Sequence, residues 1–230
     1  MIGILGGMGT QAGLDFCNKL AKLYKGKNDQ KYPLFVLYNK SNIPNRPKNL
    51  NKYKKVLKSL LDGCIFLQKN KCKFIVIPCN TAHYWFDDLQ KKIRIPIISM
   101  PKVVYFNAVK TCKKNSKIGL LATYGTLKTG IYNKFFDKNY KLINPNKFIQ
   151  SRNVNKAIKL VKMGKIREAE KAIKPAVNYL IKKKCKKIIL GCTELPIAIF
   201  AYKSFKKAKL SKTFLDPNLI LAEASMKKYK

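Results

Sequence analysis

Acidic residues are scarce in this sequence, and so are histidine and arginine. The 230 residues include 11 Asp and Glu, one His and 4 Arg against 45 Lys, so the formal net charge is +38. Such a charge is typical of proteins that bind nucleic acid or anionic membranes. Bidentate recognition of bases and phosphates favours arginine, however, and the lysines are spread from Lys19 to Lys230. We therefore interpret the charge as background composition and expect no specific nucleic-acid partner.

Long hydrophobic runs and metal-ligand spacings are also missing. No apolar stretch reaches the ~18 residues that a membrane span needs, so we expect no membrane association. The N-terminal MIGILGGMG lacks the basic segment of a signal peptide. The seven Cys include no C-x-x-C pair, and His83 is the single His, so no metal site is predicted. Free thiols without an export signal indicate a reducing cytoplasm.

Short apolar runs alternate along the chain with longer amphipathic stretches. The runs are rich in β-branched residues and bounded by Gly, Pro or polar residues, which is typical of buried strands. The alternation predicts an α/β fold with mostly parallel sheets flanked by helices. A last helix is expected to begin at Pro217, with Asp216 as its N-cap. The expected strands are 2–5, 34–38, 74–77, 95–98, 118–121 and 188–190, and the longer expected helices are 11–24, 51–69, 102–112 and 165–183.

Two sequence patterns occur twice, in the same order and at nearly the same spacing. MIGILGG is echoed by KIGLLAT, with Ile118 at 118 − 2 = 116 residues after Ile2. FIVIPCNT is echoed by KIILGCTE, with Cys192 at 192 − 79 = 113 residues after Cys79. The repeat predicts two similar lobes, which we place at residues 1–98 plus 208–230 and at 99–207. Since ligands of open α/β sheets bind at the carboxyl ends of strands, a pseudo-dyad between the lobes would bring both thiols to one ligand in the cleft.

Cys79 and Cys192 are the candidates for the chemistry. Each follows an expected strand and precedes a polar turn that starts a helix, whose positive end lowers a thiol pKa from about 8.5 toward neutrality. Such a thiolate is a general base and its thiol a general acid. A facing pair can therefore remove a proton from one face of a carbon and return it to the other. The alternative is a nucleophilic cysteine, which needs a histidine base, and His83 is the only histidine.

Polar groups beside the thiols are candidates for holding a carboxylate, because hydroxyls, amides and helix-start N–H groups bind anions. A Gly-rich turn after a strand can also hold a dinucleotide, but here the G-x-G-x-x-G spacing is broken and no acidic ribose ligand follows. We therefore expect no nicotinamide or flavin cofactor. The polar candidates are the backbone of Gly7 and Gly9 and the side chains of Asn80, Thr81, Thr123, Thr126 and Thr193.

Together these motifs resemble the aspartate/glutamate racemase family of cofactor-independent amino-acid racemases. PCNTAH together with GCTE is the specific combination. The resemblance implies two similar α/β lobes with the active site between them, no cofactor, a homodimer, and a two-base mechanism in which Cys79 and Cys192 each deprotonate one enantiomer. The matching stretches are GILGGMG at 3–9, IPNR at 43–46, PCNTAHYWFDDLQ at 78–90, IPIISM at 95–100, GLLATYGT at 119–126, GCTELP at 191–196 and LDP at 215–217.

The resemblance also implies roles for the residues around the thiols. Arg46 in IPNR matches an arginine that binds the side-chain carboxylate of an acidic amino acid, and Lys162 in KLVKMG matches a lysine that assists it. His83 is expected to give Cys79 structural or electrostatic support and not to act as a third base. Glu194 is expected either to cap the following helix or to tune the pKa of Cys192. The remaining implied substrate-binding residues are Met8, Gly9, Asn80, Thr81, Thr123, Thr126 and Thr193.

Several positions depart from the family pattern. Thr10 replaces a common Pro, Asn45 replaces a common Asp, and 47–55 is short and Lys-rich where relatives carry a longer Gly/Pro loop. These differences leave the choice of substrate open. The predicted function is a racemase that interconverts L- and D-aspartate or glutamate. The alternatives are another Cys-pair enzyme of the same fold, such as a hydantoin racemase or a dicarboxylate cis–trans isomerase, and a non-catalytic nucleic-acid-binding protein.

Overall fold

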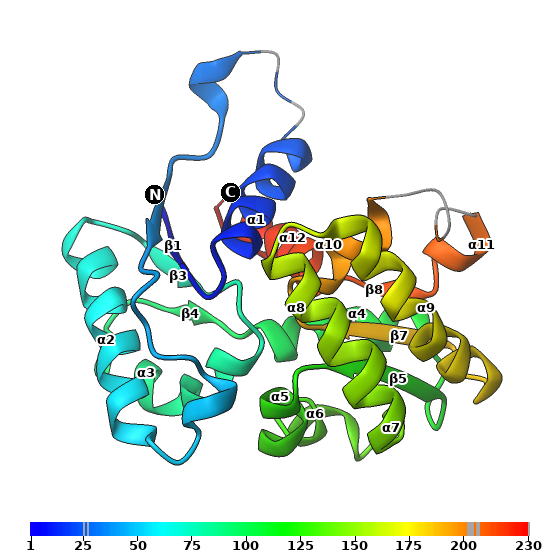
Figure 1. The fold of residues 1–230 in the computed structure, drawn as a ribbon. Coiled ribbons are helices and arrows are strands. Elements are labelled where there is room, and N and C mark those ends of the chain that lie inside the picture. Colours follow the sequence, from blue (N-terminus) through cyan, green and yellow to red (C-terminus); the bar gives the residue numbers. More distant parts are fainter. Residues whose placement is uncertain (25, 27, 202–204, 206–207, 230) are drawn as a thin grey trace. The chain divides into compact units, whose positions relative to one another are not determined.

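The computed structural model describes the whole chain except residues 25, 27, 202–204, 206–207 and 230. The chain forms two compact units, residues 1–103 with 218–230 and residues 104–217 (Figure 1). Each unit contains a four-stranded sheet in which every pairing is parallel, flanked by helices. The predicted α/β class with two similar lobes is therefore confirmed.

The first unit has the strand order β2-β1-β3-β4. Helix α2 packs an apolar stripe, formed by Val56, Leu60 and Leu67, into one core cluster with Leu5 of β1 and Ile75 of β3. These residues are four and seven positions apart, about one and two helical turns, so they lie on one helix face. Helix α4 (Met100–Thr111) begins in the first unit and continues into the second. The other elements of the first unit are β1 (Ile2–Gly6), α1 (Thr10–Leu23), η1 (Asp29–Lys31), β2 (Phe35–Asn39), η2 (Pro47–Asn49), α2 (Tyr53–Lys69), β3 (Phe74–Val76), η3 (Thr81–Trp85), α3 (Phe86–Lys92) and β4 (Ile97–Ile98).

The C-terminal helix α12 (Pro217–Tyr229) returns to the first unit. It begins at Pro217, as expected, because a proline at the first helical position sacrifices no helical hydrogen bond. Asn218, fully buried, donates from Nδ2 to the carbonyl of Ala12 at 3.1 Å and to Oδ2 of Asp15 at 2.9 Å. These bonds join α12 to α1.

The second unit has the order β6-β5-β7-β8, so each strand takes the position of its counterpart in the first unit. This shared order confirms the repeat that the sequence predicted. Helix α9 buries Ala169, Ile173, Val177 and Leu180 in one cluster with Leu190 of β7. The elements are β5 (Lys117–Ala122), α5 (Tyr124–Thr129), α6 (Asn133–Phe136), β6 (Lys141–Ile143), α7 (Lys147–Ile149), the π-helix η4 (Gln150–Asn155), α8 (Lys156–Lys162), α9 (Ile166–Lys182), β7 (Lys187–Gly191), α10 (Leu195–Phe200), α11 (Ala208–Ser211) and β8 (Phe214–Leu215).

The structure divides the chain at 103/104 and 217/218, and not at the expected 98/99 and 207/208. Residues 208–217 belong to the second unit because Phe214 and Leu215 form β8, which pairs with Ile188 and Ile189 of β7. The sequence prediction missed β8 and β6, which have two and three residues. Both lie at sheet edges, where a strand needs no long apolar run.

The turn after β1 requires a glycine at Gly7. Its φ is +85°, and a Cβ there would lie 2.3 Å from the carbonyl carbon of Lys40. Any side chain would therefore collide with the backbone that follows β2. This close approach fixes the position of Met8 and Gly9 at the carboxyl edge of the sheet, where α1 begins with Gly9 as its N-cap.

All seven cysteines are free, as expected, and five of them are buried. Cys17 and Cys112 are partly exposed. None of the helices in the described part of the chain combines the length and the apolarity that a membrane crossing requires.

Candidate functional site

Cys79 lies in the turn that follows β3, at the carboxyl end of the strand as predicted. Its N–H donates to the carbonyl of Ile77 at 2.7 Å, and the residue is 6% exposed. Asn80 and Thr81 are buried beside it, and Thr81 begins the short helix η3. The thiol is thus held in a tight turn between a core strand and a helix start.

His83 supports the backbone of this turn. The N–H of Met100 donates to Nε2 of His83 at 3.0 Å, so the ring proton lies on Nδ1, which is 3.0 Å from the carbonyl of Cys79 and donates to it. Burial lowers the pKa of His83, and the bond to Cys79 only partly opposes this effect. The ring is therefore neutral and both nitrogens are occupied by backbone groups. His83 has no free lone pair to act as a base for a nucleophilic Cys79.

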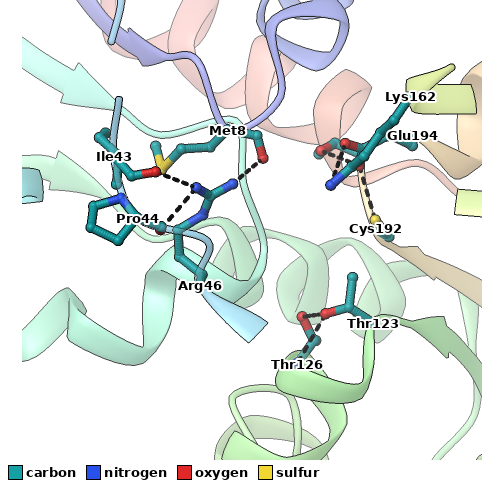
Figure 2. Close-up of polar contacts among 10 residues, drawn as sticks. Met8, Ile43, Pro44, Arg46, Thr123, Thr126, Lys162, Cys192 and Glu194 are labelled. Atoms are coloured by element: carbon teal, nitrogen blue, oxygen red, sulfur yellow. Dashed lines mark hydrogen bonds and ion pairs between the residues drawn. The ribbon is translucent and has the colours of Figure 1, made fainter. Parts of the chain in front are cut away.

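Arg46 lies in the same unit, buried next to the turn after β1. Nη1 donates to the carbonyls of Ile43 and Pro44, both at 3.1 Å, and Nη2 donates to the carbonyl of Met8 at 2.7 Å (Figure 2). Nε is buried without a hydrogen-bond partner, and no carboxylate within the described ranges forms an ion pair with Arg46. A buried cation is costly unless an anion compensates it. This guanidinium therefore favours an anionic ligand.

In the second unit, Cys192 follows β7 and contacts Glu194. The thiol donates to Oε2 of Glu194 at 2.9 Å, and Nζ of Lys162 lies 3.5 Å from Oε1 of the same carboxylate (Figure 2). Cys192 and Glu194 are 5% and 3% exposed. Helix α8 ends at Lys162, so this end of the helix brings the lysine to the turn. The structure thus places Lys162 beside the GCTE motif, and its predicted role as an assistant to Arg46 stays a prediction.

The predicted lowering of the thiol pKa is wrong for Cys192. Burial raises the pKa of Cys192 well above its usual value, and the charge of Glu194 and its hydrogen bond to the thiol raise it further. Lys162 acts in the opposite direction with a smaller effect. Helix α10, whose N-terminus was expected to favour the thiolate, has only six residues. Burial and the neighbouring carboxylate therefore outweigh the helix end, and both favour the protonated thiol of Cys192.

Thr123 and Thr126 form a capped turn after β5. Thr123 is the N-cap of α5, where its Oγ1 accepts from the N–H of Thr126 at 3.1 Å and donates to Oγ1 of Thr126, also at 3.1 Å. Gln150 holds the strand end next to them, because its Nε2 donates to the carbonyl of Ala122 at 2.9 Å. The hydroxyls thus lie at the carboxyl end of the central strand of this sheet.

Sequence reasoning missed the part that Tyr132 and Gln150 play near these turns. Tyr132 is fully buried, and burial raises its pKa well above the usual value, with further contributions from Asp216 and Cys192. The latter contributions show that Tyr132 lies near both residues. Gln150 begins the π-helix η4, a deviation that often accompanies functional sites. Asp216 is part of the LDP motif that the sequence analysis identified, whereas Tyr132 and Gln150 lie outside every identified motif.

The predicted site residues fall into one group in each unit. Met8, Gly9, Arg46, Cys79, Asn80, Thr81 and His83 belong to the first unit, and Thr123, Thr126, Lys162, Cys192, Thr193 and Glu194 belong to the second. The facing arrangement of the two thiols stays a prediction, as do the substrate-binding roles. Among the described side chains, no group of three or more His, Cys, Asp or Glu residues could hold a metal ion.

The comparisons with known proteins agree on one family. The model of the Asp/Glu/hydantoin racemase family matches residues 5–225. The broad specificity amino-acid racemase RacX of Bacillus subtilis is 29% identical over 202 residues, covering 85% of this chain and 86% of that protein. The glutamate racemase of Carboxydothermus hydrogenoformans is 27% identical over 228 residues, covering 95% and 76%. The structure of Picrophilus torridus aspartate racemase matches with a TM-score of 0.85 and 28% identity, covering 99% of this chain and 93% of that chain.

We predict that the first unit loses stability as pH falls below the ordinary His pKa of about 6.5. The unfolded chain then binds a proton that buried His83 cannot, so the free energy of unfolding falls by at most about 1.4 kcal/mol per pH unit until the folded pKa is reached. Urea unfolding at about pH 7 and about pH 5 measures the difference. Because His83 is the single histidine, His83→Gln should flatten this dependence. An unchanged slope in the variant would show that another group titrates.

We also predict that Glu194→Gln lowers the pKa of Cys192, because it removes the adjacent negative charge and keeps the side-chain size. The thiolate is the form that reacts with iodoacetamide, so alkylation of Cys192 at mildly alkaline pH should become at least about 10-fold faster, a change of one pKa unit. Mass spectrometry of the Cys192 peptide over time gives this rate. The matched control is Glu168→Gln, which removes an exposed carboxylate from α9. Equal rates in wild type and Glu194→Gln would contradict the assignment.

Proposed function

The chain belongs to the Asp/Glu/hydantoin racemase family, and on that premise we propose that it interconverts the L and D forms of aspartate or glutamate. Its relatives include proteins named as amino-acid, aspartate and glutamate racemases. The observation that carries the acidic substrate is Arg46, a buried guanidinium with no carboxylate partner in the described part of its unit. A neutral hydantoin offers no side-chain carboxylate to this cation.

The reaction needs one proton removed from the α-carbon and one returned to its opposite face. In the proposed mechanism, Cys79 as thiolate takes the α-proton while Cys192 as thiol supplies a proton to the other face. Cys79 then ends as a thiol and Cys192 as a thiolate, so the protons balance. For the opposite enantiomer the roles are reversed, with Cys192 as the thiolate base and Cys79 as the thiol acid. The hydrogen bond from Cys192 to Glu194 at 2.9 Å supports this order, because it favours a protonated Cys192 before the substrate binds.

The substrate is held by groups of opposite charge and by neutral donors. Arg46 binds the side-chain carboxylate and Lys162 assists, while Asn80, Thr81, Thr126 and Thr193 hold the α-carboxylate and the amino group. Lys162 is 44% exposed and pairs with Glu194, so its ammonium can contact both a ligand and the carboxylate beside Cys192. These roles follow from the resemblance together with the polarity of each side chain.

Three further features belong to the proposal. The two thiols supply both the acid and the base, so we expect no cofactor. The free thiols fit a reducing compartment, which favours the cytoplasm. A homodimer is expected from the resemblance. Chiral analysis of L-aspartate, L-glutamate and L-alanine after incubation with the enzyme tests the activity and the substrate together.

Replacing either catalytic thiol should abolish racemisation. In Cys79→Ser and Cys192→Ser one acid–base group is lost, since a Ser hydroxyl is far too weak a base at neutral pH. The remaining thiol can still exchange the α-proton of one enantiomer, so in deuterated water the two variants should label opposite enantiomers, as measured by NMR.

The control is Cys112→Ser, which removes a partly exposed thiol and should retain full activity. Labelling of the same enantiomer by both variants, or racemisation by either one, would rule out the two-base mechanism.

Arg46 should set the preference for a side-chain carboxylate. Losing a charge-assisted hydrogen-bond pair costs about 1.5–3 kcal/mol, so Arg46→Gln should lower kcat/KM for aspartate roughly 10- to 150-fold. Turnover of alanine, which has no second carboxylate, should fall much less. Steady-state kinetics on both substrates, with exposed Arg94→Gln as control, measure the ratio. An equal fall on both substrates would leave Arg46 a purely structural role.

A further inference from the structure

The second unit concentrates lysines at the amino ends of its strands. Four segments, 113–117, 137–141, 182–187 and 212–213, contain 11 lysines among 18 residues and a single carboxylate, Asp137. Lysine makes up 45 of the 230 residues in the whole chain, so these segments hold about three times the average share. Background composition does not account for this excess. We call this set the lysine edge: Lys113, Lys114, Lys117, Lys138, Lys141, Lys182, Lys183, Lys184, Lys186, Lys187 and Lys212.

Backbone hydrogen bonds hold the lysine edge together. The N–H of Lys186 donates to the carbonyl of Lys117 at 2.8 Å, and the N–H of Lys141 donates to the carbonyl of Ser116 at 3.1 Å. Nζ of Lys187 donates to the carbonyl of Lys212, which joins the starts of β7 and β8. Neighbouring strands lie about 5 Å apart, so the edge spans about 15 Å across the four strands. The sheet itself thus fixes the spacing of the charges.

These charges are exposed and uncompensated. All of the lysines in the edge are exposed except Lys187, which is half-buried. None of them forms an ion pair with a carboxylate from any described residue. Repulsion among so many like charges opposes folding, so the edge favours a ligand that carries several negative charges in a row.

We propose that the lysine edge binds the phosphate backbone of double-stranded nucleic acid without recognising its sequence. Duplex DNA carries one negative charge per about 1.7 Å, so a 15 Å length presents about nine charges. The edge contains no arginine for bidentate contacts to bases.

Other polyanions fit the lysine edge less well. Single strands need exposed aromatic side chains for stacking, and the one aromatic residue in these segments, Tyr140, is buried. An anionic membrane favours a group of exposed apolar side chains that insert into it. Among the described residues directly next to these four segments, Ile181 alone is an exposed large apolar residue. Duplex nucleic acid requires neither feature.

The lysine edge does not overlap the candidate catalytic residues of its unit. Strands β5 and β7 begin at Lys117 and Lys187 and end immediately before Thr123 and Cys192. In a parallel sheet these are opposite edges. A bound duplex therefore leaves the thiol end open, and the inference stands independently of the racemase proposal.

Fluorescence anisotropy with a labelled duplex of about 20 base pairs tests the inference, using the whole chain. At low salt the wild type should bind, and log K should fall linearly with log salt, by about 0.9 per phosphate contacted. Lys113→Glu/Lys114→Glu/Lys183→Glu should weaken binding at least about 10-fold and reduce the salt slope by about 2 to 3. The matched control, Lys54→Glu/Lys55→Glu/Lys58→Glu on exposed positions of α2, changes the net charge equally and should have a much smaller effect.

Equal weakening by the two triple variants would overturn the inference, because only net charge would then matter. Binding to vesicles of anionic lipid in place of the duplex would overturn it as well, as would preference for single-stranded DNA. Thermal unfolding checks that both variants are folded. If the charge reversal unfolds the protein, Lys138→Gln/Lys183→Gln/Lys212→Gln tests the same surface with neutral side chains, and a duplex affinity equal to wild type would then refute it.

Discussion

Parallel strand pairing is the constraint on which both units depend. Because every strand in a sheet runs the same way, each connection must cross from one end of the sheet to the other, and helices such as α2 and α9 make that crossing while burying their apolar faces. All carboxyl ends then meet at one edge and all amino ends at the other. Cys79, Cys192 and their polar neighbours occupy the first kind of edge, and the lysine edge of the second unit occupies the other kind.

Burial decides the chemistry of the polar groups at these strand ends. Arg46 is surrounded by backbone carbonyls with no carboxylate among its described neighbours, so it favours an anion. Glu194 has the opposite problem and is compensated by Lys162 and by the thiol of Cys192. Low exposure strengthens each of these interactions, because water does not screen them.

Local patterns predicted most of the fold. β3 and β7 are rich in β-branched residues. The motif around each cysteine follows one of these two strands, so the positions of Cys79 and Cys192 followed from adjacency in the sequence. β6 and β8 were missed because a three- or two-residue edge strand carries almost no periodic signal. The order of the strands was not predictable from any one segment, and the repeat predicted only that the two lobes would be similar.

Properties that depend on distant contacts were harder to predict. Burial and the carboxylate of Glu194 raise the pKa of Cys192. The start of the following helix, which led to the prediction of a lowered pKa, has a smaller effect. Tyr132 approaches Cys192 from a segment with no recognisable motif. The ion pair between Lys162 and Glu194 was likewise not predicted, because the two residues are far apart in the sequence.

The two cysteine turns occupy equivalent places in repeated topologies, yet their supports differ. The carbonyl of Cys79 is held by a neutral histidine, whereas the sulfur of Cys192 donates to a carboxylate. In a symmetric pair of identical chains every substitution appears in both halves, so the two halves must remain alike. In one chain that contains both halves, a residue in either half can be substituted alone. Here a histidine binds the turn of Cys79 and a glutamate binds the thiol of Cys192. A chain that contains both halves of a repeat can therefore adapt the surroundings of each cysteine separately.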